Sequence, residues 1–253
     1  MLSALIIILR EVLEAGLIIS ALLATARIKN ISPRTLMLGL FFGIGGALLI
    51  ANNMVSISNF NDGVGQELLN ATLDIGIIAM LAGASVSNLL DGPPLFGWCA
   101  AGAIACAVSR EVSEIIIYAS SFSASFSAFI PVLIGGTIGT GIGLSIGALL
   151  YYFLAYQPSR LALLISSILL ALIAAGMGAE AVGYFDQAGL IPAQPPFWNT
   201  SSWIAEDSIG GQILHALIGY EATPTLLQLI AYALTFLFIS GLGALRVKPE
   251  ADA

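Results

Sequence analysis

Charged side chains are scarce in this sequence. Asp, Glu, Lys and Arg together make up 9% of its 253 residues, whereas hydrophobic residues make up 58%. A soluble globular domain carries about 25% charged residues, so the shortage excludes that class. The composition predicts an integral membrane protein whose chain crosses the bilayer several times.

Cysteine and histidine are also rare. The two cysteines, Cys99 and Cys106, are seven residues apart in one apolar run. A helix places them on nearly the same face but too far apart for a disulfide, so we expect small apolar residues. The single histidine, His215, falls outside the apolar runs, so a metal site within those runs is expected to use oxygen ligands alone.

The same shortage argues against an enzyme. No Ser-His or Cys-His pair is available within the apolar runs. An intramembrane di-metal oxidase would need Glu-x-x-His pairs there, which the runs also lack. We therefore expect neither catalysis nor a prosthetic group.

Seven apolar runs are long enough to cross a bilayer, which takes roughly 20 helical residues. They cover about 2–26, 34–56, 64–90, 95–119, 129–154, 160–185 and 224–246. The first run has neither a basic segment before it nor an obvious cleavage site, so we expect a permanent span rather than a signal peptide. The predicted fold is all-α and integral to the membrane, with seven transmembrane helices in a single domain over residues 1–253.

Lysine and arginine in the loops set the expected orientation. Apart from Arg10 and Arg110, the basic residues lie in loops or at the ends of the runs: Arg27, Lys29, Arg34, Arg160, Arg246 and Lys248. With seven spans all of them fall on one side, which the positive-inside rule identifies as the cytoplasm; the N-terminus is then outside and the C-terminus inside. The outer side receives the acidic residues Asp62, Asp186, Glu206, Asp207 and Glu221. An acidic outer face concentrates cations, although a loop emptied of Lys and Arg is acidic in any case.

Six of the charged residues inside the apolar runs form two copies of one motif. The first span carries REVLE, from Arg10 to Glu14, and the fourth carries REVSE, from Arg110 to Glu114. On a helix the arginine and both glutamates of each motif share one face, where arginine and the second glutamate can pair at i and i+4. Four carboxylates and two guanidiniums leave a formal negative surplus in lipid, which protons or a cation must satisfy. Carboxylate oxygens favour hard cations such as Fe(III), Ca, Mg and Mn, and the alternative is a structural ion-pair lock between the two spans.

Three spans separate the two motifs, so their helices run in opposite directions. This is the pattern of an inverted repeat, with repeat 1 at about 1–92, repeat 2 at about 93–186, an outer connection at 187–223 and a seventh helix at 224–246. Small residues at four-residue spacing, which allow close helix packing in lipid, recur in the second span of each half: Gly39, Gly43, Ala47, Gly135, Gly139, Gly143 and Gly147.

Three further acidic residues lie near the outer ends of spans. Glu67 and Asp74 share a face of the third span, and Glu180 lies on the sixth. We expect them to form an access path to the motif carboxylates; alternatively Glu67 lies in interfacial water and neighbouring hydroxyls satisfy Asp74. The segment SIGGQILHALIGYE in the outer connection has helical spacing and is expected to lie along the outer surface.

REVLE and REVSE resemble the R-E-G-L-E motifs of the oxidase-dependent, high-affinity iron permease family. The resemblance extends to the seven spans, to Glu67 at the start of the third, and to a GY…P…Y stretch formed by Gly219, Tyr220, Pro224 and Tyr232. It implies a permease that imports ferric iron, with Glu11, Glu14, Glu111 and Glu114 as iron ligands and Arg10 and Arg110 as supporting ion pairs. The sequence departs from the family at Val12, Val112, Ser113 and Asn70, which leaves the metal open.

The resemblance also implies surroundings and alternatives. The expected location is the plasma membrane, or the inner membrane of a bacterium, with iron as transported substrate and an extracytoplasmic ferroxidase or iron-delivery protein as partner. A homo-oligomer is compatible with this reading, and no nucleic-acid partner is expected. The alternatives are a permease for lead, ferrous iron or manganese, or a proton-coupled carrier for an organic cation, which metal dependence would distinguish.

Overall fold

The computed structural model describes residues 1–87 and 93–244, and within them almost all regular structure is helical. The described helices are α1 Leu2–Ile28, α2 Pro33–Asn52, α3 Met54–Ser58, η1 Phe60–Gly63, α4 Gly65–Ser87, α5 Pro93–Ser120, α6 Phe126–Tyr156, α7 Ser159–Gln187, α8 Ile209–Ile218 and α9 Leu226–Ala244. In these described ranges the strand pairing is limited to one isolated bridge, between Pro196 and Thr225. The predicted all-α class is confirmed.

Each predicted apolar run corresponds to one long helix whose ends lie within a few residues of the prediction. Proline and serine explain several of the starts. Pro33 occupies the first turn of α2, where the Ser32 hydroxyl accepts a hydrogen bond from the backbone of Arg34. Pro158 stands immediately before α7, after the extended residue Gln157 ends α6. Proline fixes φ near the helical value and lacks an N–H, so it fits a helix start and ends the preceding helix.

Five of the helices, α2, α4, α6, α7 and α9, are long and apolar enough to cross a membrane. This confirms that the chain is a membrane protein with several transmembrane helices. The remaining long helices, α1 and α5, have 27 and 28 residues and carry the two charged motifs.

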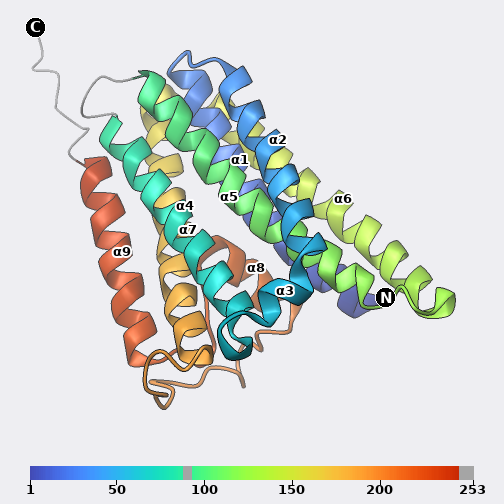
Figure 1. The fold of residues 1–253 in the computed structure, drawn as a ribbon. Helices are drawn as coiled ribbons and strands as arrows, with labels where there is room; N and C mark the ends of the chain where they lie inside the picture. Colours follow the sequence, from blue (N-terminus) through green and yellow to red (C-terminus); the bar gives the residue numbers. More distant parts are fainter. Residues whose placement is uncertain (88–92, 245–253) are drawn as a thin grey trace, which may run out of the picture.

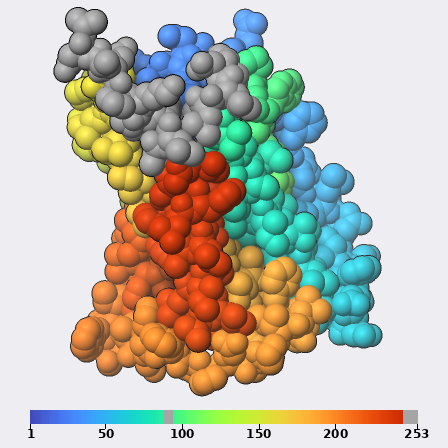
Figure 2. Space-filling view, turned by 90° about the vertical axis from the view of Figure 1, so that its left-hand side faces the viewer, coloured from blue at the N-terminus to red at the C-terminus, as the bar shows by residue number. Residues whose placement is uncertain are grey.

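The long helices run side by side in one bundle (Figure 1). α3, η1 and the connection between α7 and α9 lie at one end of the bundle, and the turn between α1 and α2 lies at the other (Figure 1). A view of the neighbouring face shows α9 in red along the bundle, with the residues of the connection in orange around its foot (Figure 2). The connection therefore covers the end of the bundle at which α7 finishes.

The small-residue faces bring two pairs of helices into close contact, α1 with α6 and α2 with α5. A Cβ atom added to Gly139 of α6 would lie 2.6 Å from the carbonyl oxygen of Leu5 in α1. One added to Gly39 of α2 would lie 2.3 Å from the carbonyl oxygen of Ala101 in α5. Such distances leave no room for a side chain, so these glycines serve helix packing, as the spacing predicted.

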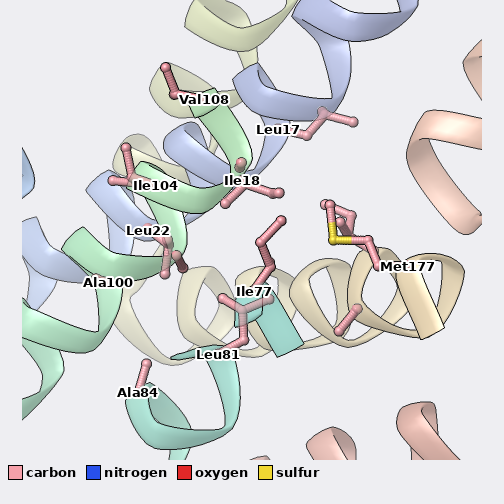
Figure 3. Close-up of a cluster of buried hydrophobic side chains, with 14 of the residues drawn as sticks. Leu17, Ile18, Leu22, Ile77, Leu81, Ala84, Ala100, Ile104, Val108 and Met177 are labelled. Atoms are coloured by element: carbon pink, nitrogen blue, oxygen red, sulfur yellow. The ribbon is translucent and has the colours of Figure 1, made fainter. Parts of the chain in front are cut away.

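An apolar layer fills the middle of the bundle between the charged motifs and the α1–α2 turn (Figure 3). Its largest buried side chains come from four helices, α1, α4, α5 and α7. The largest buried members include Leu17, Ile18, Leu22, Ile77, Leu81, Ile104 and Met177. Along the chain these residues follow the first motif in α1 and Asp74 in α4, and they precede the second motif in α5 and Glu180 in α7, so the layer closes one side of the charged region.

The helix expected along the outer surface takes a different position. α8 does form within the predicted segment, but it packs against α7 and α1. Gly219 ends α8 in the left-handed region at φ 64°. A Cβ added to Gly176 of α7 would lie 2.7 Å from the Cα atom of Gly219. Glycine at both positions lets the end of α8 dock directly on α7. The expectation of a surface helix was therefore wrong.

The α1–α6 contact yields a prediction with a matched control. Gly139→Ala should destabilise the protein by about 1–3 kcal/mol, because the added methyl group meets the backbone of α1. Gly141→Ala, two residues away where no atom lies within 4 Å of the added Cβ, should be neutral or stabilise by up to about 1 kcal/mol. Thermal unfolding of the two purified variants in one detergent compares them. Equal unfolding midpoints would contradict the packing role of Gly139.

Candidate metal centre

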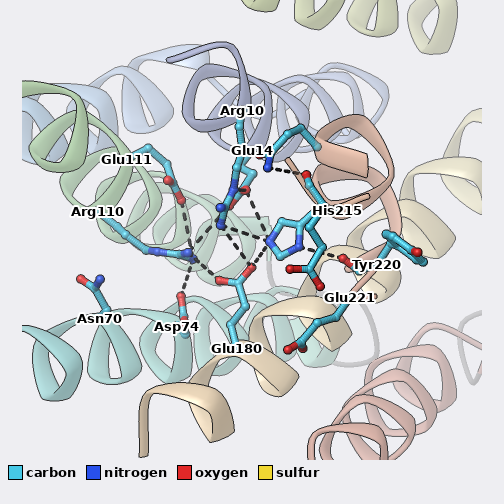
Figure 4. Close-up of polar contacts among 12 residues, drawn as sticks. Arg10, Glu14, Asn70, Asp74, Arg110, Glu111, Glu180, His215, Tyr220 and Glu221 are labelled. Atoms are coloured by element: carbon cyan, nitrogen blue, oxygen red, sulfur yellow. Dashed lines mark hydrogen bonds and ion pairs between the residues drawn. The ribbon is translucent and has the colours of Figure 1, made fainter. Parts of the chain in front are cut away.

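The two motifs meet in the middle of the bundle, where charged side chains from five helices gather (Figure 4). α1 supplies Arg10, Glu11 and Glu14, and α5 supplies Arg110 and Glu111. Three further residues complete the group: Asp74 of α4, Glu180 of α7 and His215 of α8.

Arg110 is the centre of this group and has no exposed surface. Its Nη1 atom donates to Oδ1 of Asp74 at 2.7 Å, and its Nη2 atom donates to Oε2 of Glu180 at 2.5 Å. Glu114, the partner expected four residues along the helix, is farther away at 3.7 Å. Tertiary partners therefore replace the local pair, because a fully buried guanidinium gains most from short, directed bonds to carboxylates.

Arg10 differs from Arg110 in both partners and exposure. Its Nε atom donates to Oε1 of Glu14 at 2.8 Å, which confirms the i, i+4 pair expected in the first motif. The side chain is 27% exposed, and its Nη2 atom lies 3.2 Å from Nε2 of His215. Arg10 thus reaches from the first motif toward α8 and the solvent.

Three carboxylates of the two motifs form a compact cluster. One oxygen from each of Glu11, Glu14 and Glu111 lies within 4.8 Å of the others, and all three residues are buried. Among the described residues, Oε2 of Glu11 and both oxygens of Glu111 have no hydrogen-bond partner, although Arg110 lies 3.7 Å from Glu111. Buried carboxylate oxygens without donors are costly, so the cluster can bind a cation that supplies the missing contacts.

The fourth motif glutamate stands apart from this cluster. The side chain of Glu114 is 27% exposed and accepts a hydrogen bond of 3.1 Å from the amide of Asn70. The amide therefore satisfies Glu114 where a carboxylate would repel it.

The three residues expected on an access path have different surroundings. Glu180 lines a cavity that opens beside Arg10. Asp74 has no exposed surface and is held by Arg110. Glu67 lies in the first turn of α4 with one buried carboxylate oxygen that finds no partner in the described structure, and it does not line the cavity. The structure brings Asp74 and Glu180 together through Arg110, and it leaves Glu67 apart from them.

His215 is the residue that sequence reasoning missed. Its Nε2 atom lies 2.5 Å from Oε1 of Glu180 and 3.8 Å from Oε1 of Glu14, and its Nδ1 atom lies 2.9 Å from the carbonyl oxygen of Tyr220. Two groups of side chains could hold a metal ion. One is Glu14, Glu180 and His215, and the other is the cluster of Glu11, Glu14 and Glu111. The ligand set expected from the sequence used oxygen atoms alone and did not include His215. The available signal was a lone histidine followed four residues later by a glycine that can end a short helix.

The carboxylates around His215 change its protonation. Burial alone disfavours the imidazolium, but the hydrogen bond and charge of Glu180, with the charge of Glu14, outweigh it and raise the pKa of His215 to about 9. The surroundings of Nε2 thus favour positive charge at this atom.

A cavity of about 270 Å³ leads to this region from the end covered by the connection. Two acids of the connection line it: Glu206, which accepts a hydrogen bond from the backbone of Ala222, and Glu221, which accepts one from the side chain of Gln228. Burial raises the pKa of Glu221. The complete lining is Arg10, Glu180, Gly183, Tyr184, Gln187, Glu206, Gln212, His215, Glu221 and Gln228.

Residues 95–247, more than half of the chain, match the model of the iron permease FTR1 family. The chain belongs to the iron permease FTR1 family. The matched segment holds the second motif, Glu180 and His215, and the membership confirms the resemblance drawn from REVLE and REVSE. It assigns the protein to a family of iron transporters. Neither curated proteins nor solved structures gave a significant match to the chain.

The burial of Arg110 yields a stability prediction. Arg110→Met should destabilise the protein by about 3–5 kcal/mol, because it leaves Asp74 buried without its partner. The double variant Arg110→Met/Asp74→Asn should recover part of this loss, since one uncompensated charge is removed. Unfolding midpoints in detergent measure both. A double variant that is less stable than Arg110→Met would contradict the pairing.

Proposed function

We propose that this protein imports iron, in its ferric form, across a cell membrane through the buried glutamates of its two motifs. The observation that carries the proposal is the cluster of Glu11, Glu14 and Glu111, whose buried oxygens lack donors in the described structure. Glu114, the fourth motif glutamate, lies outside this cluster near Arg110, and Arg10 and Arg110 hold the glutamates in place. Family membership supports iron as the transported ion.

Charge supports a highly charged cation. Six carboxylates and two guanidiniums interact in this region, which leaves a formal surplus of four negative charges when His215 is neutral. The residues are Arg10, Glu11, Glu14, Asp74, Arg110, Glu111, Glu114 and Glu180. In a region of low dielectric a trivalent ion offsets more of this surplus than a monovalent or divalent one. Oxygen ligands also suit a hard ion such as Fe(III).

We further propose that α1 and α5 cross the membrane with the five apolar helices, which gives seven spans with the N-terminus outside. Their lengths of 27 and 28 residues and their place inside the bundle support this. Arg27, Lys29 and Arg34 cluster at the α1–α2 turn, opposite the acidic connection, as the positive-inside rule requires. Arg246 and Lys248, which entered the same argument, lie outside the described residues.

The helix pairing supports an inverted repeat of residues 1–92 and 93–186. The second helix of each half packs on the first helix of the other half: α2 on α5, and α6 on α1. A two-fold relation between the halves produces such an exchange. The charged group then lies where the halves meet, open to the cavity on one side and closed by the apolar layer on the other. Transport would require the halves to rock so that this layer opens.

The remaining parts of the proposal concern the surroundings. The protein would act in the plasma membrane, or in the inner membrane of a bacterium. A ferroxidase or an iron-delivery protein would dock on the outer connection, residues 187–223, because this segment forms the acidic mouth of the cavity.

Iron uptake tests the proposal in cells that lack their own high-affinity importer. Glu11→Gln and Glu111→Gln should each lower uptake by about tenfold or more, because each removes a ligand charge from the cluster. Asp62→Asn, an exposed acid in η1 remote from the cluster, should import like the wild type at equal membrane expression.

The outcomes separate the candidates. Full uptake by both glutamate variants would overturn the site assignment and leave the motifs as structural ion pairs. Lead and manganese are measured in parallel, and accumulation of either without iron would overturn the substrate. Uptake of an organic cation in the absence of any metal ion would identify the proton-coupled carrier instead.

A further inference from the structure

The part of the charged group around His215 differs from the all-carboxylate cluster in its chemistry, and the two share only Glu14. We propose that Glu14, Glu180 and His215 form an outer metal-binding station that admits first-row transition-metal ions and discriminates against Ca²⁺ and Mg²⁺. The proposal rests on the proposed function, since it places this station on the route of the imported ion. It adds a nitrogen ligand and a selectivity step that the carboxylates alone do not provide.

The orientation of the imidazole is the first support. Nδ1 lies 2.9 Å from the carbonyl oxygen of Tyr220, an atom that can only accept, so Nδ1 carries a hydrogen and donates it. Gly219 allows this contact, because its left-handed conformation turns the chain back toward His215 at the end of α8. Metal-binding histidines are commonly held in this way, by donating the other ring N–H to a backbone carbonyl. Nε2 is therefore the atom presented to a metal.

The ligand geometry is the second support. Nε2 of His215 and one oxygen from each of Glu14 and Glu180 all lie within 4.8 Å of one another. Nitrogen and oxygen ligands about 2.1 Å from one ion lie roughly 3–4 Å apart. The present distances of 2.5 Å to Glu180 and 3.8 Å to Glu14 need only small side-chain rotations to reach that range.

A positive group already stands at this position. The guanidinium of Arg10 bonds Glu14 at 2.8 Å and approaches Nε2 of His215 to 3.2 Å. Nε2 has a carboxylate on one side and a donor-only guanidinium on the other, so it cannot form a good hydrogen bond to both at once. A metal ion would satisfy both carboxylates and Nε2 together. Arg10 can make room for it, because its side chain is partly exposed and lines the cavity.

The ligand types determine which ions bind. Imidazole nitrogen suits iron, nickel, copper and zinc, whereas Ca²⁺ and Mg²⁺ prefer oxygen ligands throughout. The cluster of Glu11, Glu14 and Glu111 offers oxygen alone, so it has little basis for rejecting abundant Ca²⁺ and Mg²⁺. A station with one nitrogen ligand, reached first from the cavity, supplies that discrimination.

Glu14 belongs to both ligand sets, which suggests how the ion passes between them. An ion bound by Glu14, Glu180 and His215 can exchange the latter two for Glu11 and Glu111 without leaving Glu14. This step is a ligand exchange in which the ion keeps its oxidation state. Arg10 then returns to Glu14 and His215 and separates the inner ion from the cavity.

The single histidine makes a direct test available. The full chain, purified with a tag that contains no histidine, is loaded with one equivalent of Cu²⁺, a paramagnetic ion that favours imidazole nitrogen, and electron spin-echo modulation from ¹⁴N is recorded. His215 is the only histidine, so imidazole coupling can come from no other residue. We expect this coupling in the wild type and in Glu11→Gln, and its loss in His215→Gln. A wild-type spectrum without imidazole coupling would overturn the station.

Selectivity is tested on the same samples. The Ca²⁺ concentration that displaces half of the bound Cu²⁺ should fall about tenfold or more in His215→Gln, as removal of a ligand predicts. An unchanged concentration would show that the nitrogen confers no discrimination. The His215→Gln variant is used only if its gel-filtration elution volume and its unfolding midpoint equal those of the wild type. If they differ, the presence or absence of imidazole coupling in the wild-type spectrum decides whether the station exists.

Failure of this inference is distinguishable from failure of the proposed function. If iron uptake does not depend on Glu11 or Glu111 while imidazole coupling persists, the import route is wrong and the metal station stands. If uptake depends on them and the wild type shows no coupling, import stands and the station is wrong.

Discussion

The ion-pair network of Arg110 is the interaction on which the rest of the structure depends. This guanidinium has no exposed surface, and it bonds Asp74 on α4 and Glu180 on α7 from its own position on α5. Three helices are thereby fixed around one charge in a region where water cannot replace a lost partner. Breaking such a buried pair costs far more than a surface pair contributes. The network also sets where Glu14, Glu111 and Glu180 lie relative to one another.

The excess of carboxylates over arginines gives this network its chemical capacity. Arg110 and Arg10 satisfy some of the acids, but the buried oxygens of Glu11 and Glu111 keep no hydrogen-bond partner in the described chain. The two sides of this charged group differ. A polar cavity lies on the side of the connection, and packed leucine, isoleucine and methionine side chains lie on the other. We propose that the deficit of positive charge is met by the imported ion, and that the apolar layer keeps the opposite side closed until the halves move.

The sequence predicted the helices well and the site in part. Long apolar runs, prolines at helix starts and four-residue glycine spacing are local signals, so the long helices and the close packing at Gly39 and Gly139 could be predicted, whereas the short helices α3 and η1 were not. The partners of Arg110 could not, because Asp74 and Glu180 come from helices whose rotation depends on packing. The position of His215 was missed because α8 docks through a contact of Gly219 with Gly176, and no signal in the sequence predicts that these two glycines meet. Glu114 shared its motif with Glu111, yet Asn70 holds it outside the cluster.

The central claim is that buried carboxylates of the two motifs bind the transported ion. Anomalous X-ray scattering at the iron absorption edge, from crystals of the full chain loaded with iron, tests it most directly. The account predicts an iron peak within about 2–2.5 Å of oxygens of Glu11, Glu14 and Glu111, or within similar distances of Glu14, Glu180 and His215. Iron bound only at the surface, with the ion pairs of Arg10 and Arg110 unchanged and no iron among the motif glutamates, would contradict it.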